Sequence, residues 1–296
     1  MKNPLRLIIC CLVLIVGSGI ASAGNRNSRE LNLATFNIRY GTPKDTGVRN
    51  WEARKAACAS CIKDGDFDVV GIQEALANQQ QDLKDMLPEY EFEFVGRDDG
   101  TKGEAVGIGY KKDRLKALES GRFWLSPTPE IPSNAQQWGG PTRHRVAIWI
   151  KFEDLRTGKQ FFYLTTHLEV GRDHANVRAE SAALIIGKAK ELNPDGLPFF
   201  VTGDLNPAGQ SEEMLLRFRR YFQDSFHLAY DQNCLYGPTG TYNGFNPDAD
   251  LSAHGKKGDY IFGKGEYTLR RYDAVARKYE GQYPSDHLAV VIRVRL

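Results

Sequence analysis

A glycine, a carboxylate and an amide follow one apolar segment of this chain. Residues 197–201 have the composition of a buried strand, and Gly203, Asp204 and Asn206 come directly after it. In open α/β proteins, ligands bind at the carboxyl ends of strands. A carboxylate and a carboxamide suit hard oxygen chemistry: holding a divalent cation, positioning a water or donating to a phosphate oxygen. They also suit a plain loop in which Asp204 caps the next turn, so this stretch alone leaves both interpretations open.

The same kinds of polar residue stand at the ends of other apolar segments. Polar strand ends are expected in any fold, since strands end at solvent. The repeated use of carboxylates, amides and imidazoles is less expected, and it favours a site over unrelated loops. The residues are Asn37, Glu74, His167, Asp259, Asp286 and His287.

Six short motifs hold these residues. They are TFNIR (35–39), GIQE (71–74), THLE (166–169), GDLN (203–206), GDYIF (258–262) and SDH (285–287). In this order they make residues 31–296 resemble the endonuclease/exonuclease/phosphatase superfamily of metal-dependent phosphoesterases, with its pancreatic-deoxyribonuclease-like fold. GDLN or SDH alone would say little, whereas six motifs in the family's order are specific. Stretches at 96–104, 123–129 and 145–149 resemble a bacterial exported branch, which does not define the substrate.

The resemblance implies a metal site on one side of a cleft. Glu74 would be the main ligand of Mg²⁺, with Mn²⁺ as a substitute, and Asn37 and Asp286 would lie beside it. Magnesium prefers oxygen ligands and keeps several waters, so one or two carboxylates hold it. Asn37 would also contact the substrate. The alternative for Glu74 is a plain helix-start residue, because carboxylates favour that position.

The resemblance places an activated water on the other side of the scissile phosphate. His287 would be hydrogen-bonded to Asp259, because a carboxylate behind an imidazole fixes its tautomer and raises its basicity. Asp204 would bind and help to activate the attacking water, and Asn206 would donate to a phosphate oxygen. Asp204 and His287 share the role of base, since either one can remove the proton.

A second histidine, His167, matches one that contacts the phosphate or assists the leaving group. In the branch that resembles pancreatic deoxyribonuclease a glutamate backs this histidine, and we expect Glu104 there. Arg145 is expected to contact the phosphate, with a surface ion pair as the alternative. Such groups are needed because anionic phosphate oxygens repel a nucleophile and charge builds on the oxygens during attack.

Strand-like and helix-like segments alternate along the chain, with strands in the majority. Nearly every boundary is a short turn, and many adjacent strands suit antiparallel pairing. We therefore expect an α/β fold of four layers, α/β/β/α, in which two packed mixed sheets are flanked by helices. Residues 127–141 and 223–255 are expected to be irregular. The expected helices are 51–63, 78–87, 175–192 and 212–220, and the expected strands are 31–39, 67–73, 91–95, 105–111, 115–123, 145–152, 160–167, 197–202, 259–262, 269–276 and 288–294.

The N-terminal pattern is that of a secretory signal peptide. Lys2 and Arg6 precede the apolar segment 7–16, and small residues offer a cleavage site after Ala23. The apolar segment is short and ends in small residues, which disfavours a retained anchor. We expect an exported protein, periplasmic or secreted. The expected division is a signal peptide at 1–23, a linker at 24–30 and one endonuclease/exonuclease/phosphatase domain at 31–296.

Without its leader the chain is formally neutral. The full chain has 39 basic and 37 acidic residues, and the leader holds two of the basic and none of the acidic ones, which leaves 37 of each. A neutral chain lacks the broad positive surface of a general nucleic-acid binder, so nucleic acid is a disfavoured partner unless a local basic cleft exists. No further apolar stretch is long enough to span a membrane, and we expect a monomer.

The expected activity is hydrolysis of a phosphate ester, either a monoester or a diester, by a Mg²⁺-dependent enzyme. Nuclease, sphingomyelinase-like and sugar-phosphate phosphatase activities compete within this class, because loops without a readable code select the substrate. The alternative class is a non-catalytic protein that binds a ligand or partner on the same scaffold. Loss of a catalytic residue would mark that class, and every expected residue is present.

Overall fold

Two mixed sheets hold the strands of this chain. The computed structural model describes residues 29–252 and 255–296, so the expected leader and residues 24–28 of the linker lie outside the described residues. The strands are β1 (Leu31–Asn37), β2 (Val69–Ala75), β3 (Tyr90–Gly96), β4 (Ala105–Lys111), β5 (Leu115–Trp124), β6 (Val146–Asp154), β7 (Gln160–His167), β8 (Phe199–Asp204), β9 (Gln223–Asp224), β10 (Leu235–Tyr236), β11 (Asp259–Lys264), β12 (Thr268–Val275) and β13 (Ala289–Arg295). One sheet has seven strands in the order β10-β12-β13-β1-β2-β4-β3, and the other has six in the order β5-β6-β7-β8-β11-β9.

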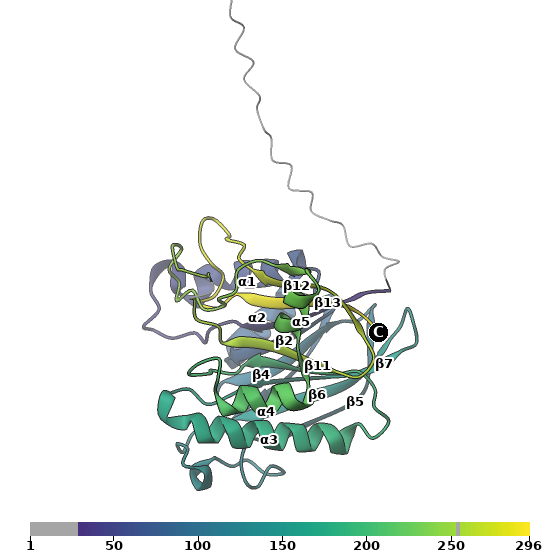
Figure 1. Ribbon diagram of the computed structural model, residues 1–296. Coiled ribbons are helices and arrows are strands. Elements are labelled where there is room, and N and C mark those ends of the chain that lie inside the picture. Colours follow the sequence, from purple (N-terminus) through teal and green to yellow (C-terminus); the bar gives the residue numbers. More distant parts are fainter. Residues whose placement is uncertain (1–28, 253–254) are drawn as a thin grey trace, which may run out of the picture.

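Helices cover the outer faces of both sheets. The α-helices are α1 (Trp51–Asp64), α2 (Ala77–Met86), α3 (Ala175–Leu192), α4 (Glu213–Tyr221) and α5 (Ser225–Asp231). Apolar side chains of α1 and α2 pack on the seven-stranded sheet, and those of α3 and α4 pack on the six-stranded sheet, along the lower face in Figure 1. A third core lies between the sheets and contains Val69 from one sheet and Ile148 and Phe200 from the other. The expected four-layer α/β sandwich is confirmed.

The buried strands have few polar residues because both of their faces are covered. In β1, β2 and β8 nearly every side chain is buried, since one face meets the other sheet and the opposite face meets helices. This explains why β2 and β8 begin as short, continuous apolar segments, whereas β1 carries Asn32 and Thr35 among its apolar residues. In β2 and β8 the polar residues come at the end of the strand.

The expectation that residues 223–255 are irregular is wrong at their beginning. They start with the short strand β9 and the helix α5, and β10 follows. The Asp224 side chain accepts a hydrogen bond from Phe226 N (3.0 Å) and so caps α5, while the Phe226 ring packs on Tyr272 at 5.5 Å. A helix of two turns is too short to show a clear period, so tertiary packing decides it. Within the described part of the chain, no helix is long and apolar enough to cross a membrane.

Candidate active site

Strand pairing brings the polar strand ends of both sheets to one edge of the sandwich. β7 and β8 are parallel, with His167 opposite Asp204, and β11 is antiparallel to β8, with Asp259 also opposite Asp204. In the other sheet β1 and β2 are parallel, and the register ends with Asn37 opposite Gln73. Because parallel strands end at the same edge, residues far apart in sequence become neighbours.

Gly203 makes this edge possible. It has a φ of 141°, and a Cβ atom there would lie 2.0 Å from the carbonyl oxygen of Thr166 on the neighbouring strand. An L-amino acid side chain rarely adopts that backbone angle and would overlap the backbone of β7. The glycine of GDLN is therefore structural, and it allows Asp204 to lie beside His167.

Asp259 and His287 form a buried pair. His287 Nδ1 donates to Asp259 Oδ2 (2.8 Å), and Thr241 Oγ1 donates to the same oxygen (2.7 Å). This bond fixes a proton on Nδ1. The other ring nitrogen, Nε2, lies 3.7 Å from Asp204 Oδ2. Burial opposes a charge on His287, but attraction to the Asp259 and Asp204 carboxylates raises the pKa of His287 well above its ordinary value. The structure thus contains the predicted hydrogen bond between His287 and Asp259.

Asn37 connects the two sides of the site. Its Nδ2 donates to Glu74 Oε1 (3.0 Å) and to Asp204 Oδ2 (3.1 Å), while Ser285 Oγ donates to the Asn37 carbonyl oxygen (2.7 Å). Ser285 Oγ also contacts Asp286 Oδ1 (3.3 Å). The SDH and TFNIR motifs are therefore joined through Ser285, the first residue of SDH, for which no role was predicted.

The carboxylates of Glu74 and Asp286 fit a divalent cation. Burial raises the pKa of Asp286, against the lowering effect of His287, and the negative charge of Glu74 adds to the rise. Glu74 holds a positive φ of 66°, a costly conformation for a residue with a side chain, and such strain concentrates at functional sites. Carboxylate and amide oxygens are the donors that Mg²⁺ prefers, so the residues present suit this ion.

His167 has the opposite environment from His287. Asn206 Nδ2 donates to His167 Nε2 (3.0 Å), so this nitrogen carries no proton. Burial, and then the positive charge of Arg145, hold the pKa of His167 well below its ordinary value. Asn206 has a φ of 47° and also donates to the Leu168 carbonyl oxygen (3.2 Å), which fixes its amide beside the imidazole. The amide of GDLN therefore contacts the imidazole of THLE.

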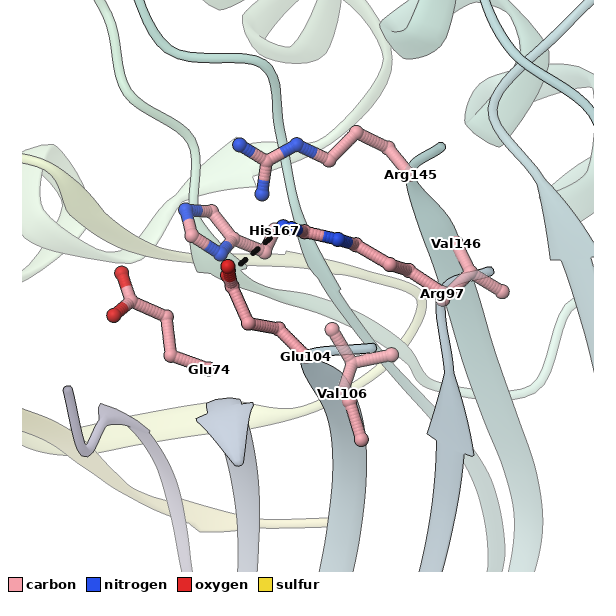
Figure 2. Close-up of a pocket in the computed structure, with 8 residues that line it drawn as sticks. Glu74, Arg97, Glu104, Val106, Arg145, Val146 and His167 are labelled. Carbon is pink, nitrogen blue, oxygen red and sulfur yellow. Dashed lines mark ion pairs between the residues drawn. The ribbon is translucent and has the colours of Figure 1, made fainter. Parts of the chain in front are cut away.

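Glu104 lies beside His167, as expected, but its ion pair is made with another residue. One donor atom each of Glu74, Glu104 and His167 lie within 4.8 Å of one another. The carboxylate of Glu104 pairs with Arg97 Nη1 at 2.9 Å, the contact drawn as a dashed line in Figure 2. Burial raises the pKa of Glu104. The sequence did not predict Arg97, although it falls in the stretch at 96–104 that resembles the exported branch.

Arg145 is buried at the site, so the alternative of a surface ion pair is wrong. Its side chain is 8% exposed, and its Nε lies 3.4 Å from Glu169 Oε2. Arg143 pairs with the same carboxylate, with its Nε at 3.2 Å from Oε2. Glu169 is the last residue of the THLE motif, so the sequence could have identified it as a site residue. Thr241, which holds Asp259, lies in no motif.

The chain belongs to the Endonuclease/Exonuclease/phosphatase family, whose model matches residues 34–287. The fold is shared with solved structures over most of its length. A mannosyl-6-phosphatase of Bacteroides thetaiotaomicron is 31% identical, with a TM-score of 0.78, over 90% of this chain and 100% of that one. An endonuclease/exonuclease/phosphatase of Bacteroides vulgatus is 34% identical, with a TM-score of 0.79, over 90% and 99%.

A curated relative matches a smaller part. Tyrosyl-DNA phosphodiesterase 2 of Danio rerio is 30% identical over 139 residues, which are 47% of this chain and 32% of that protein. The similarity to the Danio rerio protein covers about half of this chain, whereas the similarity to the two bacterial proteins covers nearly all of the described residues. This chain therefore belongs to a family of phosphoesterases and nucleases, and it shares the fold of that family.

Proposed function

We propose that this protein is an exported, Mg²⁺-dependent hydrolase of phosphate esters. The observation that carries the proposal is the position of Asp204, which contacts Asn37 on the Glu74 side and faces Nε2 of His287 on the other. Acidic oxygens for a cation and a carboxylate-backed imidazole thus flank one space. A phosphate ester needs groups of both kinds around its phosphorus atom.

Glu74, Asp286 and Asn37 are the residues that would hold the metal. When bound, Mg²⁺ supplies positive charge to the phosphate oxygens and thereby stabilises the charge that develops during attack. Two carboxylates and an amide offer the oxygen ligands that Mg²⁺ prefers, which supports a cation in that place. Mn²⁺, which accepts the same oxygen ligands, would serve as a substitute.

Asp204 and His287 would orient the attacking water and manage its proton. Burial, followed by the nearby carboxylates of Asp259 and Glu74, raises the pKa of Asp204 to about 6, against the lowering effect of His287. A carboxylate with that pKa accepts a proton efficiently near neutral pH. His287, held by Asp259, completes the pair, and Asn206 and the neutral His167 would bind the phosphate oxygens or the leaving group.

Turnover of model substrates tests this proposal. We expect p-nitrophenyl phosphate, bis(p-nitrophenyl) phosphate or mannose 6-phosphate to be hydrolysed with Mg²⁺ and not with EDTA. Mannose 6-phosphate is included because a relative is a mannosyl-6-phosphatase. Glu74→Ala and His287→Ala are each expected to reduce kcat by about 100- to 10,000-fold. His227→Ala, an exposed histidine of α5, is the matched control.

The same experiment separates the alternatives. Metal-independent binding of a carbohydrate without turnover of any ester would favour the non-catalytic protein on this scaffold. Cleavage of single-stranded DNA in preference to small esters would favour a nuclease. The partly similar relative is a tyrosyl-DNA phosphodiesterase, which makes DNA a substrate to include. A sphingomyelinase-like activity would appear as cleavage of phosphocholine from lipid vesicles.

Export and the monomeric state are parts of the same proposal. The support for export is the leader pattern of residues 1–23. Fractionation followed by N-terminal sequencing is expected to find a mature chain in the periplasm or medium that begins at Gly24. An intact leader in the cytosol would contradict it. Light scattering after size exclusion is expected to give the mass of one chain.

A further inference from the structure

A small pocket opens beside His167. It is lined by Glu74, Arg97, Glu104, Arg145 and His167 together with apolar side chains. Figure 2 shows the guanidinium groups of Arg97 and Arg145 pointing toward the imidazole of His167, with Glu104 and Glu74 on the opposite side. The pocket therefore joins the phosphate site to a group of arginines.

Three arginines share two carboxylates beside this pocket. The guanidinium groups of Arg97, Arg143 and Arg145 pair with Glu104 and Glu169, while the Glu74 carboxylate also lines the pocket. Arg143 and Arg145 share the carboxylate of Glu169, while Arg97 takes that of Glu104. Arg145 is buried and shares its carboxylate with Arg143, so an anionic ligand would give it a further partner at a position where an incompletely paired charge is unfavourable.

The arginine positions are fixed from behind. Glu169 Oε1 accepts a hydrogen bond from Val170 N (2.9 Å), and the buried Arg178 donates to the Glu169 carbonyl oxygen (2.8 Å). Arg97 Nε is a buried donor with no hydrogen-bond partner in the part of the chain that the structure describes. A preorganised guanidinium loses little side-chain entropy when it binds an anion, so these groups are ready for ligand oxygens.

The far wall of the pocket is apolar. Ala105, Val106 and Val146 line it, and each of these residues is buried. They belong to β4 and β6, which lie in different sheets and meet here. The wall offers no polar atom of a side chain, so the guanidinium groups are the hydrogen-bond donors that this pocket presents to phosphate oxygens.

We propose that this pocket receives the non-bridging oxygens of a terminal phosphate, with Arg145 and Arg97 as their donors, and that the enzyme therefore prefers phosphate monoesters to diesters. This inference rests on the proposed function, because it selects the substrate class of the same site. A monoester carries nearly two negative charges on three oxygens, whereas a diester carries one charge on two. Planar guanidinium groups bind such oxygens in bidentate fashion.

Kinetics with matched esters test the preference. We expect the wild-type enzyme with Mg²⁺ to show a kcat/KM for p-nitrophenyl phosphate at least tenfold above that for bis(p-nitrophenyl) phosphate. Arg145→Met and Arg97→Met are each expected to reduce the monoester value by about 10- to 100-fold, in line with the loss of a charge-assisted bond, and to affect the diester less. Arg145→Met leaves Glu169 paired with Arg143, so the variant retains a partner for that carboxylate.

Binding of inorganic phosphate gives a readout that needs no turnover. Titration calorimetry is expected to show that wild type binds inorganic phosphate at least tenfold more tightly than dimethyl phosphate, and that both arginine variants lose this difference. Arg145→Lys keeps the charge and is expected to retain part of it. Arg220→Met removes an exposed guanidinium of α4 that pairs with Glu213, and it is the matched control without effect.

Several results would overturn the inference. They are equal or better hydrolysis of the diester by wild type, equal binding of the two phosphates, or arginine variants with the wild-type preference. These results differ from a failure of the proposed function, in which neither ester is hydrolysed. In that case the phosphate titration still decides whether the pocket binds a terminal phosphate.

Discussion

Two buried histidines lie on either side of Asp204, and their neighbours give them opposite charge states. His287 is 3.7 Å and His167 is 3.6 Å from the same Asp204 oxygen. Carboxylates surround His287 and raise its pKa, whereas burial and arginines lower that of His167. Titratable groups whose surroundings move their pKa values apart define acid and base roles. His287 is therefore suited to proton transfer and His167 to accepting a hydrogen bond.

At this scale the first prediction concerns Asp259→Asn. We expect kcat to fall by about 100- to 1,000-fold, because the amide lacks the charge that stabilises protonated His287. Steady-state kinetics measure the fall, and circular dichroism checks that the chain remains folded. Asp273→Asn, at a partly exposed carboxylate of β12 paired with Arg271, is the control. A kcat within about threefold of wild type would show that the charge of Asp259 does not assist His287 in catalysis.

Two glycines near the end of β8 and the start of β11 allow the strands of the site to converge. The carbonyl oxygen of Thr166 occupies the space of a Cβ atom at Gly203, so β7 and β8 approach more closely there than side chains allow. Gly258 makes a second close approach, with its Cβ position 3.0 Å from Asp204 Oδ1. The two glycines let three strand ends converge on one carboxylate.

At the level of elements, Gly203→Ala is expected to destabilise the fold by about 2–4 kcal/mol, because it combines a strained φ with a backbone overlap. Chemical denaturation measures the change in the free energy of unfolding. Gly187→Ala is the matched control: Gly187 lies in α3 with open space at its Cβ position, so alanine is expected to stabilise by about 0.5–1 kcal/mol. Equal changes in the free energy of unfolding for both substitutions would contradict the structural role of Gly203.

A partly buried lysine just before β11 makes stability depend on pH. The Nζ atom of Lys257 lies 3.5 Å from the centre of the Phe226 ring and 4.7 Å from that of Tyr260. Burial lowers the pKa of Lys257 to about 7. In the unfolded chain the amine stays protonated to its ordinary value of 10.5, so between pH 7 and 10.5 the unfolded chain binds more protons and the free energy of unfolding rises with pH.

Lys257→Met removes this dependence. We expect the variant to be more stable than wild type by on the order of 1–2 kcal/mol at pH 6, where the folded lysine is charged, and the difference to approach zero at pH 10. Urea denaturation at both pH values measures it. A difference that is the same at both pH values would mean that the pKa of Lys257 is not lowered by folding.

The site exists because two sheets pack closely at one edge of the whole molecule. A Cβ atom on Gly71 would lie 2.3 Å from Thr165 Oγ1 of the opposite sheet. Gln73 Nε2 donates to Thr35 Oγ1 (3.1 Å) in its own sheet and to Thr165 Oγ1 (2.9 Å) across the interface. The glycine and the buried amide thus hold the Glu74 side of the site against the Asp204 side.

For the whole molecule, Mg²⁺ is expected to stabilise the fold. At ten times its dissociation constant the ion contributes about 1.4 kcal/mol, because it binds the folded state only. In a protein of this size that corresponds to a rise in Tm of about 2–5 °C. Scanning fluorimetry with Mg²⁺ and with EDTA measures it. Glu74→Ala is expected to abolish the rise and Glu213→Ala to keep it; a rise that survives Glu74→Ala would place the ion elsewhere.

Much of the fold could be predicted from the sequence because its strands are short apolar segments that end at polar residues. Helix α3 and strands β4 and β7 have the expected bounds. Helix α5 was missed because its seven residues depend on the Asp224 cap and on packing against Tyr272. The pairing of Glu104 with Arg97 was missed as well, because the direction of two long side chains is set by the pocket around them.

The order of motifs by itself determined the family, the sheet-forming segments and the types of residue available for catalysis. All three can be recognised from short stretches of consecutive residues, without knowledge of which residues are in contact. The tertiary structure alone decided which residues touch: Asn37 and Asp204 are 167 positions apart, and Asp259 and His287 are 28 apart. Charge states and the arginine pocket follow from such contacts, because electrostatic interactions act over a few ångströms in space, whatever the separation in sequence.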